Sequence, residues 1–353
     1  MSATKIIKVD PFIPEEQYLQ EAAGILAKGG LVIMPTETVY GIGANMLHKE
    51  AINRLYEIKE RPEDKPFSLH IEKKERVEDF ALDIPISAYK LMDRFWPGPL
   101  TLILNSKDNN TIGIRMPDNE IALRIITLSG VPVVCPSANI SGKPAPKNFA
   151  EAIGDLNGKV DFAIDAGSTA LGVESTIVDL TVKPLMLLRE GAIKKEDIEE
   201  TVNKKIVLFV CTGNSCRSVM AKGLLEKKLK ERNRSDVQVL SAGIMMLAGL
   251  GAAEDTRELL KEEGIDVSGH RSQKVTPDMI KKSDIILVME RLHEQRILEL
   301  APSVKNRLFL LKEFAKIDDN NLDIADPIGK PRGFYENTFA IIKEAIEEIA
   351  DII

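Results

Sequence analysis

A segment in the second half of the chain combines the residue types that phosphate chemistry requires. Cys211 follows the apolar run IVLFV (206–210), a loop of small polar residues comes next, and Arg217 stands where a helix is expected to begin. The backbone N–H groups of residues 212–217 and the helix N-terminus can surround a phosphate, and the arginine can hold two of its oxygens. This positive field favours the thiolate of Cys211, which can attack phosphorus and form a phosphocysteine.

The Cys-(x)5-Arg spacing by itself is a weak signal, because it is short enough to occur by chance. The context strengthens it: the segment lies between an expected strand and an expected helix, Ser218 can hydrogen-bond the thiolate, and Asp326 in ADPIG (325–329) is a candidate acid. An aspartate on a loop can protonate the leaving group and then activate water. The alternative for Asp326 is a turn, since Asp-Pro is a common turn sequence.

Hydroxyl, glycine and cationic residues gather in three segments of the first half. They are MPTETVYGIG (34–43), KERPEDKPFSLHI (59–71) and CPSANISGKPAP (135–146). Ser137, Asn139 and Ser141 directly follow an expected buried strand, where backbone and hydroxyl donors can bind phosphate. With cations on a second loop, this set suits a triphosphate. The alternative for the cations of residues 59–65 is a solvated charge run.

The elements that must position these residues divide the chain into two domains, as its 353 residues suggest. The charged stretch 190–205 predicts a short helix, and we place the boundary after residue 203. The first domain, 1–203, is predicted to mix strands and helices in one α/β sheet. Its expected helices lie near 15–30, 49–60, 85–95 and 147–156, and its strands at 31–34, 66–71, 100–104, 131–136, 161–165 and 175–180.

The second domain, 204–353, shows a regular alternation of apolar strand and amphipathic helix patterns. Strands are expected at 206–210, 237–243 and 284–289 and near RLFLL (307–311), and helices near 217–232, 252–263 and from Tyr335 to the end. This order predicts a doubly wound parallel sheet. Active sites of such sheets lie beyond the carboxyl ends of the strands, where IVLFV delivers Cys211.

Composition excludes several other classes. With 44% hydrophobic and 29% charged residues the chain is typical of globular proteins, and three cysteines and four histidines offer neither a disulfide framework nor a Cys/His zinc site. No metal site within the protein is predicted. The net charge of −7 argues against a general nucleic-acid coat. No apolar run is long enough to span a membrane and the N-terminus lacks a signal core, so we expect a cytoplasmic protein without a membrane partner.

Over about 150 residues the second domain resembles the low-molecular-weight protein phosphatases. The motifs that carry the resemblance are CTGNSCRS (211–218), SAG (241–243), DIILVM (284–289), LKEF (311–314) and DP (326–327). It implies that Cys211 is the nucleophile, Arg217 the phosphate clamp and Asp326 the general acid, with a phosphoprotein as substrate. The implied phosphate loop comprises Thr212, Gly213, Asn214, Ser215, Cys216 and Ser218, of which Asn214 and Ser218 organise the loop.

This segment departs from the family pattern at two positions. Val219 replaces the usual proline, which should affect helix entry only. Ser215 is small and hydroxylic, like the threonine of protein-arginine-phosphatase relatives, and this modestly favours phosphoarginine over phosphotyrosine; Tyr335 could line either pocket. Cys216 stands where many members keep a second cysteine, which can form a protective disulfide with Cys211 or simply be a small residue at the helix start.

Over residues 10–200 the first domain resembles the YrdC-type threonylcarbamoyl-AMP synthases of tRNA modification. The motifs are PTETVYG, K-x-R-P with KP and His70, PGPLT (97–101), IRMP (114–117), PSAN-x-SG, ESTIVD (174–179) and LREGAI (188–193). The resemblance implies condensation of L-threonine, bicarbonate and ATP, with Mg²⁺ accompanying ATP, to threonylcarbamoyl-AMP and pyrophosphate. A downstream tRNA-modifying transferase complex is the implied partner.

Carried over by the resemblance, the threonine side of the site comprises Thr36, Thr38, His70, Arg124 and Ser175. The ATP side comprises Lys59, Arg61, Lys65, Arg115, Ser137, Asn139, Ser141 and Arg189. A buried structural role is the alternative for His70. Glu190 replaces a proline of relatives and is expected to weaken the phosphate contact of Arg189. Long relatives carry a separate regulatory domain where this chain has its phosphatase-like domain.

The sequence therefore predicts a bifunctional enzyme, a threonylcarbamoyl-AMP synthase fused to a phosphocysteine-forming phosphatase. The alternative from another class is a catalytically silent nucleotide- or RNA-binding module with a phosphate-sensing domain. Nucleotide binding without ATP turnover on adding threonine and bicarbonate would distinguish it.

Overall fold

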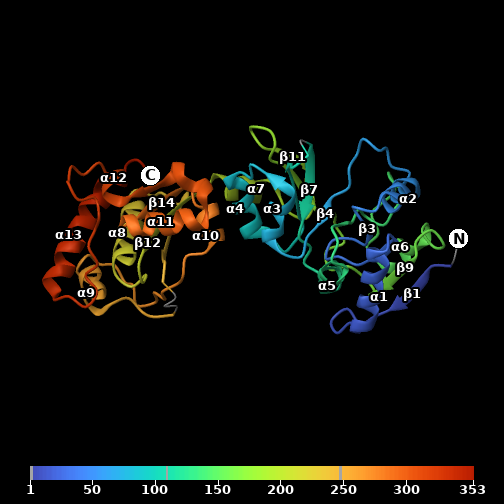
Figure 1. The fold of residues 1–353 in the computed structure, drawn as a ribbon, viewed down its shortest axis with the longest axis horizontal. Coiled ribbons are helices and arrows are strands. Elements are labelled where there is room, and N and C mark those ends of the chain that lie inside the picture. The colour runs from blue at the N-terminus through green and yellow to red at the C-terminus, as the bar shows by residue number, and fades with distance from the viewer. Residues whose placement is uncertain (1–2, 109, 246–248) are drawn as a thin grey trace. The chain divides into compact units, whose positions relative to one another are not determined.

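The computed structural model describes residues 3–108, 110–245 and 249–353, and the chain separates into two compact units, Met1–Thr201 and Val202–Ile353. The predicted boundary after residue 203 lies two residues beyond this division. Helix α7 (Lys195–Asn203) extends across it and accounts for the charged stretch that suggested a short helix. Each unit is described by itself below (Figure 1).

The first unit is built on a mixed sheet of eleven strands among the described residues, in the order β1-β9-β2-β3-β8-β4-β7-β6-β10-β11, with β5 paired to β6. The strands are β1 (Lys5–Lys8), β2 (Val32–Met34), β3 (Gly41–Asn45), β4 (Leu69–His70), β5 (Ala81–Leu82), β6 (Leu100–Ser106), β7 (Thr111–Arg115), β8 (Val133–Val134), β9 (Phe162–Asp165), β10 (Thr176–Asp179) and β11 (Met186–Arg189). Hairpins such as β2–β3 and β6–β7 are antiparallel, whereas β2–β9 and β6–β10 are parallel. The predicted mixed α/β architecture is confirmed.

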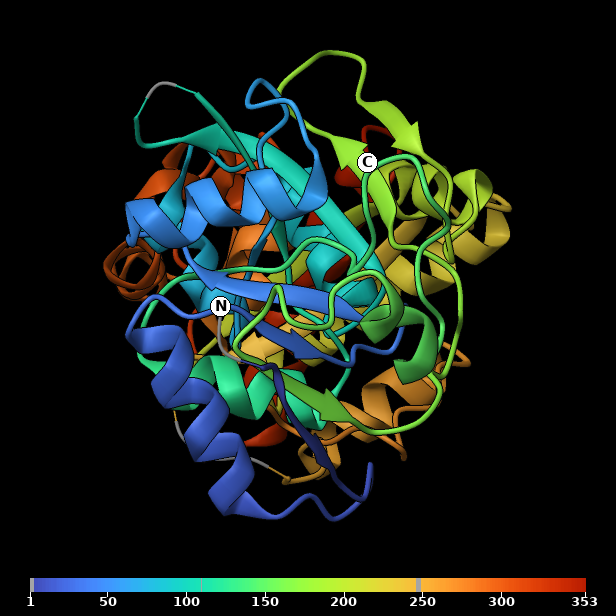
Figure 2. The same ribbon diagram turned by 90° about the vertical axis from the view of Figure 1, so that its right-hand side faces the viewer.

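Helices cover both faces of this sheet. They are α1 (Glu16–Ala27), α2 (Lys49–Lys59), α3 (Val77–Phe80), α4 (Ile86–Phe95), α5 (Glu120–Ser129) and α6 (Phe149–Gly154). Because side chains alternate along a strand, Val32 and Met34 pack under α1 and α5 while Ile33 packs with α2 and α6 on the other face. Figure 2 shows α1 and α2 on opposite sides of the strands.

The second unit has a four-stranded, fully parallel sheet in the order β13-β12-β14-β15. Its strands are β12 (Lys205–Cys211), β13 (Val237–Gly243), β14 (Ile285–Val288) and β15 (Leu308–Leu310). Its helices are α8 (Arg217–Glu231), α9 (Glu254–Glu262), α10 (Pro277–Lys282), α11 (Arg291–Leu300), α12 (Leu311–Phe314) and α13 (Arg332–Ile349). Phe209 packs under α8 and α13, and Val210 packs under α10 and α11, so the predicted doubly wound sheet is confirmed.

Several elements differ from the sequence-based expectation. The strand expected at 66–71 shortens to β4, since Pro66 has no N–H for a sheet ladder. The run 41–45, for which no element was predicted, forms β3 because it pairs with β2 and β8. Helices α5 and α11 were not predicted. Helix α13 begins at Arg332 rather than Tyr335, because Pro331 precedes its first turn.

Candidate active sites

The phosphate loop joins the end of β12 to the start of α8. Cys211, the last residue of β12, is 2% exposed. Its Sγ lies 3.0 Å from the Ser218 hydroxyl and accepts the backbone N–H of Asn214 at 3.3 Å. These polar neighbours can stabilise a thiolate at the bottom of the loop.

Asn214 holds the loop in shape. It has a φ of 54°, a left-handed conformation that asparagine tolerates better than most residues. Its buried side chain donates to the hydroxyls of Ser218 and Ser241, both at 3.0 Å, and accepts the backbone N–H of Gln273 at 3.0 Å. The SAG segment thus contributes Ser241 as a support of the loop.

Arg217 is the charged centre of this site. It is 1% exposed and its guanidinium forms ion pairs with Glu290 and Asp326. It also donates to the carbonyl of Ile324 at 2.7 Å and to the Thr212 hydroxyl at 2.9 Å. Its buried Nε has no hydrogen-bond partner among the described residues and remains available for a phosphate oxygen.

A histidine that sequence reasoning missed completes the surroundings of Arg217. His293 Nδ1 accepts the backbone N–H of Glu290 at 3.1 Å, so the neutral ring carries its proton on Nε2, 3.0 Å from the Thr212 hydroxyl. Burial and nearby Arg217 lower the pKa of His293 to about 4. The neutral ring therefore adds no repulsion to the cation. In the sequence, the one sign of this role is that Glu290 and His293 follow the DIILVM segment closely.

The remaining loop residues surround Cys216. Its Sγ lies 3.6 Å from the Ser215 hydroxyl and 4.0 Å from the hydroxyl of buried Tyr335. Burial raises the pKa of Cys216, and Cys211 and Cys216 are both free thiols. Gly213 lies in the turn between Thr212 and Asn214. Val219 donates its N–H to the Cys216 carbonyl at 3.0 Å, a contact that a proline could not make.

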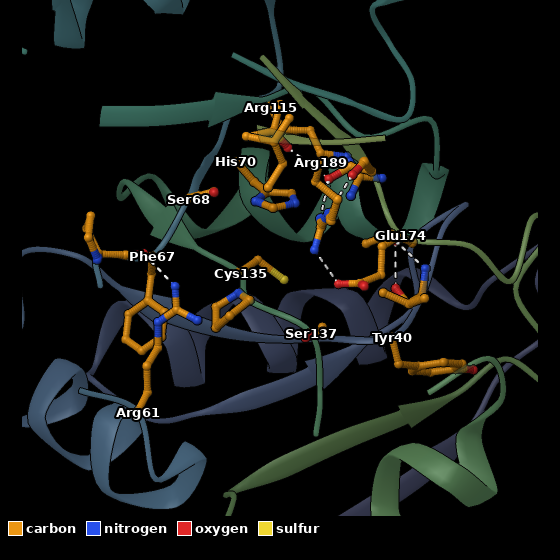
Figure 3. A pocket seen from close by; sticks show the side chains of 18 residues that line it. Tyr40, Arg61, Phe67, Ser68, His70, Arg115, Cys135, Ser137, Glu174 and Arg189 are labelled. Carbon is orange, nitrogen blue, oxygen red and sulfur yellow. Dashed lines mark hydrogen bonds and ion pairs between the residues drawn. The ribbon is translucent and has the colours of Figure 1, made fainter. Parts of the chain in front are cut away.

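The first unit contains a pocket at the centre of its sheet (Figure 3). It brings together seven of the predicted site residues, namely Thr36, Arg61, His70, Arg115, Ser137, Ser175 and Arg189. Tyr40, Phe67, Cys135 and Glu174 also line it and were not predicted as site residues. Burial raises the pKa of the Cys135 thiol to about 12, so this thiol stays protonated.

Two of the pocket arginines are each held by a glutamate and a hydroxyl. Arg115 is 5% exposed, forms an ion pair with buried Glu37 at 2.7 Å, and donates to the Thr38 hydroxyl at 2.9 Å. Arg189 pairs with Glu174 and donates to the Ser175 hydroxyl at 3.1 Å.

Arg61 lies over the ring of Phe67, 5.3 Å from its centroid. In Figure 3, His70 and Cys135 lie between Arg61 and Arg189. The pocket thus has cations on more than one side, an arrangement suited to a polyphosphate.

His70 lines this pocket as a neutral ring. The ring is 4% exposed, and burial together with Arg115 lowers its pKa to about 3. Its Nδ1 has no hydrogen-bond partner among the described residues. A buried ring nitrogen without a partner is unusual, and the binding role of His70 stays a prediction.

Known proteins match both units. Residues 24–191 match the Sua5, YciO and YrdC family model, described as telomere recombination, and residues 206–353 match the low molecular weight phosphotyrosine protein phosphatase model. A crystal structure of Pyrococcus abyssi Sua5 complexed with L-threonine is 31% identical, with a TM-score of 0.55, and the match covers 87% of this chain and 99% of that one. The protein-arginine-phosphatase of Geobacillus stearothermophilus is 37% identical over 145 residues, 41% of this chain and 93% of the relative.

The chain belongs to both families. The chain is also 43% identical over 219 residues to the threonylcarbamoyl-AMP synthase of Pyrococcus abyssi, a match covering 60% of this chain and 64% of the relative. The chain therefore spans less than two thirds of that curated relative. In the described part of the molecule, none of the helices has the length and apolar character needed to cross a bilayer.

Lys59 does not line the pocket of the YrdC-type domain, contrary to the sequence-based expectation. It is 2% exposed, and its Nζ donates to the carbonyls of Ser137 at 2.5 Å and Asn139 at 2.7 Å. Burial lowers the pKa of Lys59 to about 8. A buried ammonium needs acceptors, and Lys59 finds them in two carbonyls of the PSAN loop, which it holds in place.

Other predicted residues also lie outside the pocket lining. Arg124 is a correction: it stands on the exposed face of α5, where its guanidinium pairs with Glu16 at 2.6 Å. Asn139 donates to the Ile140 and Lys143 carbonyls within its own loop. Three further predicted residues, Thr38, Lys65 and Ser141, are not among the lining residues either.

The expected effect of Glu190 is also corrected. Its carboxylate lies 3.3 Å from Lys194, one turn along the chain, and Arg189 pairs with Glu174 instead. The carboxylate beside Arg189 is therefore that of Glu174 in the ESTIVD segment. This segment lies next to Arg189 because β10 pairs with β11 in the sheet.

Proposed function

We propose that the chain is a bifunctional enzyme that makes threonylcarbamoyl-AMP in its first domain and hydrolyses a phosphoprotein in its second. The observation that carries the first activity is the pocket in which Arg61, Arg115 and Arg189 surround neutral His70. The threonine-bound relative supports L-threonine as one substrate. Bicarbonate and ATP are the other two substrates that we propose.

The synthase reaction needs no protein nucleophile. The threonine amine attacks the bicarbonate carbon, the C–N bond forms and water is released, which leaves a carbamate. A carbamate oxygen then attacks the α-phosphorus of ATP, the bond to the bridging oxygen breaks, and pyrophosphate leaves. The pocket arginines bind the phosphates and stabilise the negative charge that grows on pyrophosphate. Thr36, Ser137 and Ser175 hold the reactants in line, so positioning supplies the rest of the catalysis.

Magnesium would accompany ATP and neutralise part of its phosphate charge. In the described chain no group of three or more His, Cys, Asp or Glu side chains is placed to hold a metal ion. Glu174 is the acidic residue among those lining the pocket. One carboxylate plus phosphate oxygens is a common magnesium environment, so the residues present fit an ion that binds with the nucleotide.

The product is a mixed anhydride of a carbamic and a phosphoric acid, which water can hydrolyse. We therefore propose that a tRNA-modifying transferase complex takes it up for threonylcarbamoyladenosine formation. This partner is inferred from the chemistry of the product.

The synthase proposal is tested by threonine-dependent pyrophosphate release in the presence of bicarbonate and MgATP. Arg61→Ala should lower release by about 10²-fold, the usual scale for removing one electrostatic stabiliser. Arg124→Ala removes an arginine outside the pocket and should leave release unchanged. Full activity of the Arg61 variant would contradict the assignment of this pocket.

In the phosphatase domain, the geometry supports a two-step transfer. The Cys211 thiolate attacks phosphorus, forming the S–P bond as the bond to the leaving group breaks, and Asp326 donates a proton to the leaving atom. Asp326 then takes a proton from water as that water cleaves the phosphocysteine. Arg217 pairs with Asp326 and offers Nε–H to the phosphate.

Phosphoarginine is the substrate we favour. Ser215 leaves room for a guanidinium and can hydrogen-bond it, and the partly exposed carboxylates of Glu290 and Asp326 make the mouth of the site negative. Phosphate release from phosphoarginine and phosphotyrosine peptides, with Cys211→Ser as blank, tests this. Faster release from phosphotyrosine would overturn the preference, and normal turnover by Cys211→Ser would refute the nucleophile.

The alternative of two silent binding domains is less favoured. A binding loop has no need for a buried cysteine that accepts an N–H, or for a partly exposed aspartate beside the phosphate clamp. Nucleotide binding without threonine-dependent turnover would restore this alternative.

A further inference from the structure

Lys312 is a buried lysine in the LKEF segment that takes no part in the proposed reaction. It lies in α12, directly after β15, and is 4% exposed. Its Nζ lies 2.5 Å from Asp319 Oδ2 and donates to the Asn321 carbonyl at 2.8 Å. A buried ammonium is tolerated only when it is paired, so these two acceptors fix the position of the chain at residues 319–321.

Residues 315–331 contain no helix or strand, although they carry Asp326. Side chains organise this loop step by step. Asp319 accepts the backbone N–H of Asn321 at 3.0 Å, and Asn321 accepts that of Asp323 at 3.0 Å. Asp323 in turn accepts the N–H of Arg291, the first residue of α11, at 2.9 Å.

The loop then reaches the catalytic arginine. The N–H of Ile324 donates to the Met289 carbonyl at 2.7 Å, and the Ile324 carbonyl accepts from Arg217 at 2.7 Å. Asp326 pairs with Arg217 two residues later. The contacts therefore run without interruption from Lys312 to the carboxylate of Asp326.

We propose that Lys312 is a positioning residue for Asp326: its buried ammonium anchors the start of the loop and thereby holds the general acid over the leaving group. The inference rests on the proposed phosphatase function. The hydrogen bond from Lys312 also lowers the pKa of the Asp319 carboxyl. The ammonium–carboxylate pair adds to the backbone hydrogen bonds at the start of this loop, from Ile317 N–H to the Lys312 carbonyl and from Asp319 N–H to the Ile317 carbonyl, both at 3.0 Å.

The consequence is specific to proton donation. A displaced Asp326 slows departure of a weakly acidic leaving group more than that of a strongly acidic one, which leaves without help. Phenyl phosphate and 4-nitrophenyl phosphate differ in this respect and are similar in size. Lys312→Met should lower the ratio of kcat/KM for phenyl phosphate to that for 4-nitrophenyl phosphate by about tenfold, part of the ~10²–10⁴ that a general acid contributes.

The test compares Lys312→Met and Asp319→Asn with Lys305→Met, which removes an exposed lysine outside the loop. Lys305→Met should leave the ratio unchanged. In the Asp326→Ala background, Lys312→Met should cause no further fall in the ratio, because residues that act through one group are not additive. Hydrogen exchange of β12 amides reports whether each variant is folded.

An equal loss of kcat/KM on both substrates would overturn the role of Lys312, and so would a further fall of the ratio when Lys312→Met is added to Asp326→Ala. If Lys312→Met does not fold, the same ratio of kcat/KM values is measured on Asp319→Asn, where an unchanged ratio would overturn the proposal. Failure of the wild-type chain to release phosphate from these two substrates and also from phosphoarginine peptides, or undiminished hydrolysis by Cys211→Ser, would instead refute the proposed phosphatase function.

Discussion

At the scale of single residues, the phosphatase domain combines a charged and a neutral group in close contact. Arg217 keeps its charge between two carboxylates, whereas the His293 ring remains neutral and hydrogen-bonds Thr212. A protonated His293 would lose its acceptor nitrogen toward Glu290 and repel Arg217. The site thus depends on a histidine that does not ionise near neutral pH.

This dependence predicts how stability changes with pH. The pKa of His293 is about 4 when folded and about 6.5 when unfolded, so the unfolded chain binds the proton first. The contribution of neutral His293 to the free energy of unfolding should therefore be complete above about pH 6.5. About 3 kcal/mol of it should be lost as the pH falls to 4.

Hydrogen exchange of the β12 amides at several pH values measures this effect. His293→Asn retains an acceptor for the Glu290 N–H but does not titrate, and should show a smaller fall in protection between pH 6.5 and 4. His48→Asn, in the first unit, is the matched control. An equally steep fall in the His293 variant would contradict the prediction.

At the scale of elements, the phosphate loop takes its shape from the strand beside it. β13 ends at Gly243, where an added Cβ would lie 2.7 Å from the Thr212 carbonyl oxygen and 2.9 Å from the Asn214 nitrogen. Both neighbours are backbone atoms, which cannot turn aside. The glycine is therefore needed for this close approach rather than for an unusual φ.

Gly243→Ala should displace the phosphate loop and destabilise the second unit by about 1–3 kcal/mol. The displaced loop should also lower the phosphatase activity. Gly251→Ala is the control, because a Cβ there meets nothing within 4 Å. Unfolding and aryl-phosphate hydrolysis are measured on both variants. A Gly243 variant with unchanged activity would show that the loop can retreat from β13.

At the scale of the whole molecule, each unit has its own hydrophobic core. The clusters around Val32 and Ile33 contain first-unit residues only, and those around Phe209 and Val210 contain second-unit residues only. Apolar burial thus stabilises the two domains separately.

Two single-site variants should therefore separate the activities. Cys211→Ser should abolish phosphatase activity and leave threonine-dependent pyrophosphate release unchanged, whereas Arg61→Ala should do the opposite. Assaying both reactions on each full-length variant checks this. Loss of both activities in either variant would demonstrate coupling between the sites.

The sequence by itself determined the features that depend on neighbours along the chain. The strand–loop–helix around Cys211 and Arg217 is local, because a loop that binds phosphate through its own backbone needs a contiguous segment. The alternation after residue 203 likewise predicts a parallel sheet, since each helix must return the chain to the same edge.

Tertiary structure decided which charges meet. Sequence could not show that Lys59 bonds carbonyls beneath the PSAN loop, that Arg124 faces outward on α5, or that Glu290 and His293 reach Arg217. Each outcome depends on segments that are distant in sequence. A cation that becomes buried must pair with an acceptor, because burial without a partner is costly. Which acceptor lies near it depends on how distant segments pack in the folded sheet.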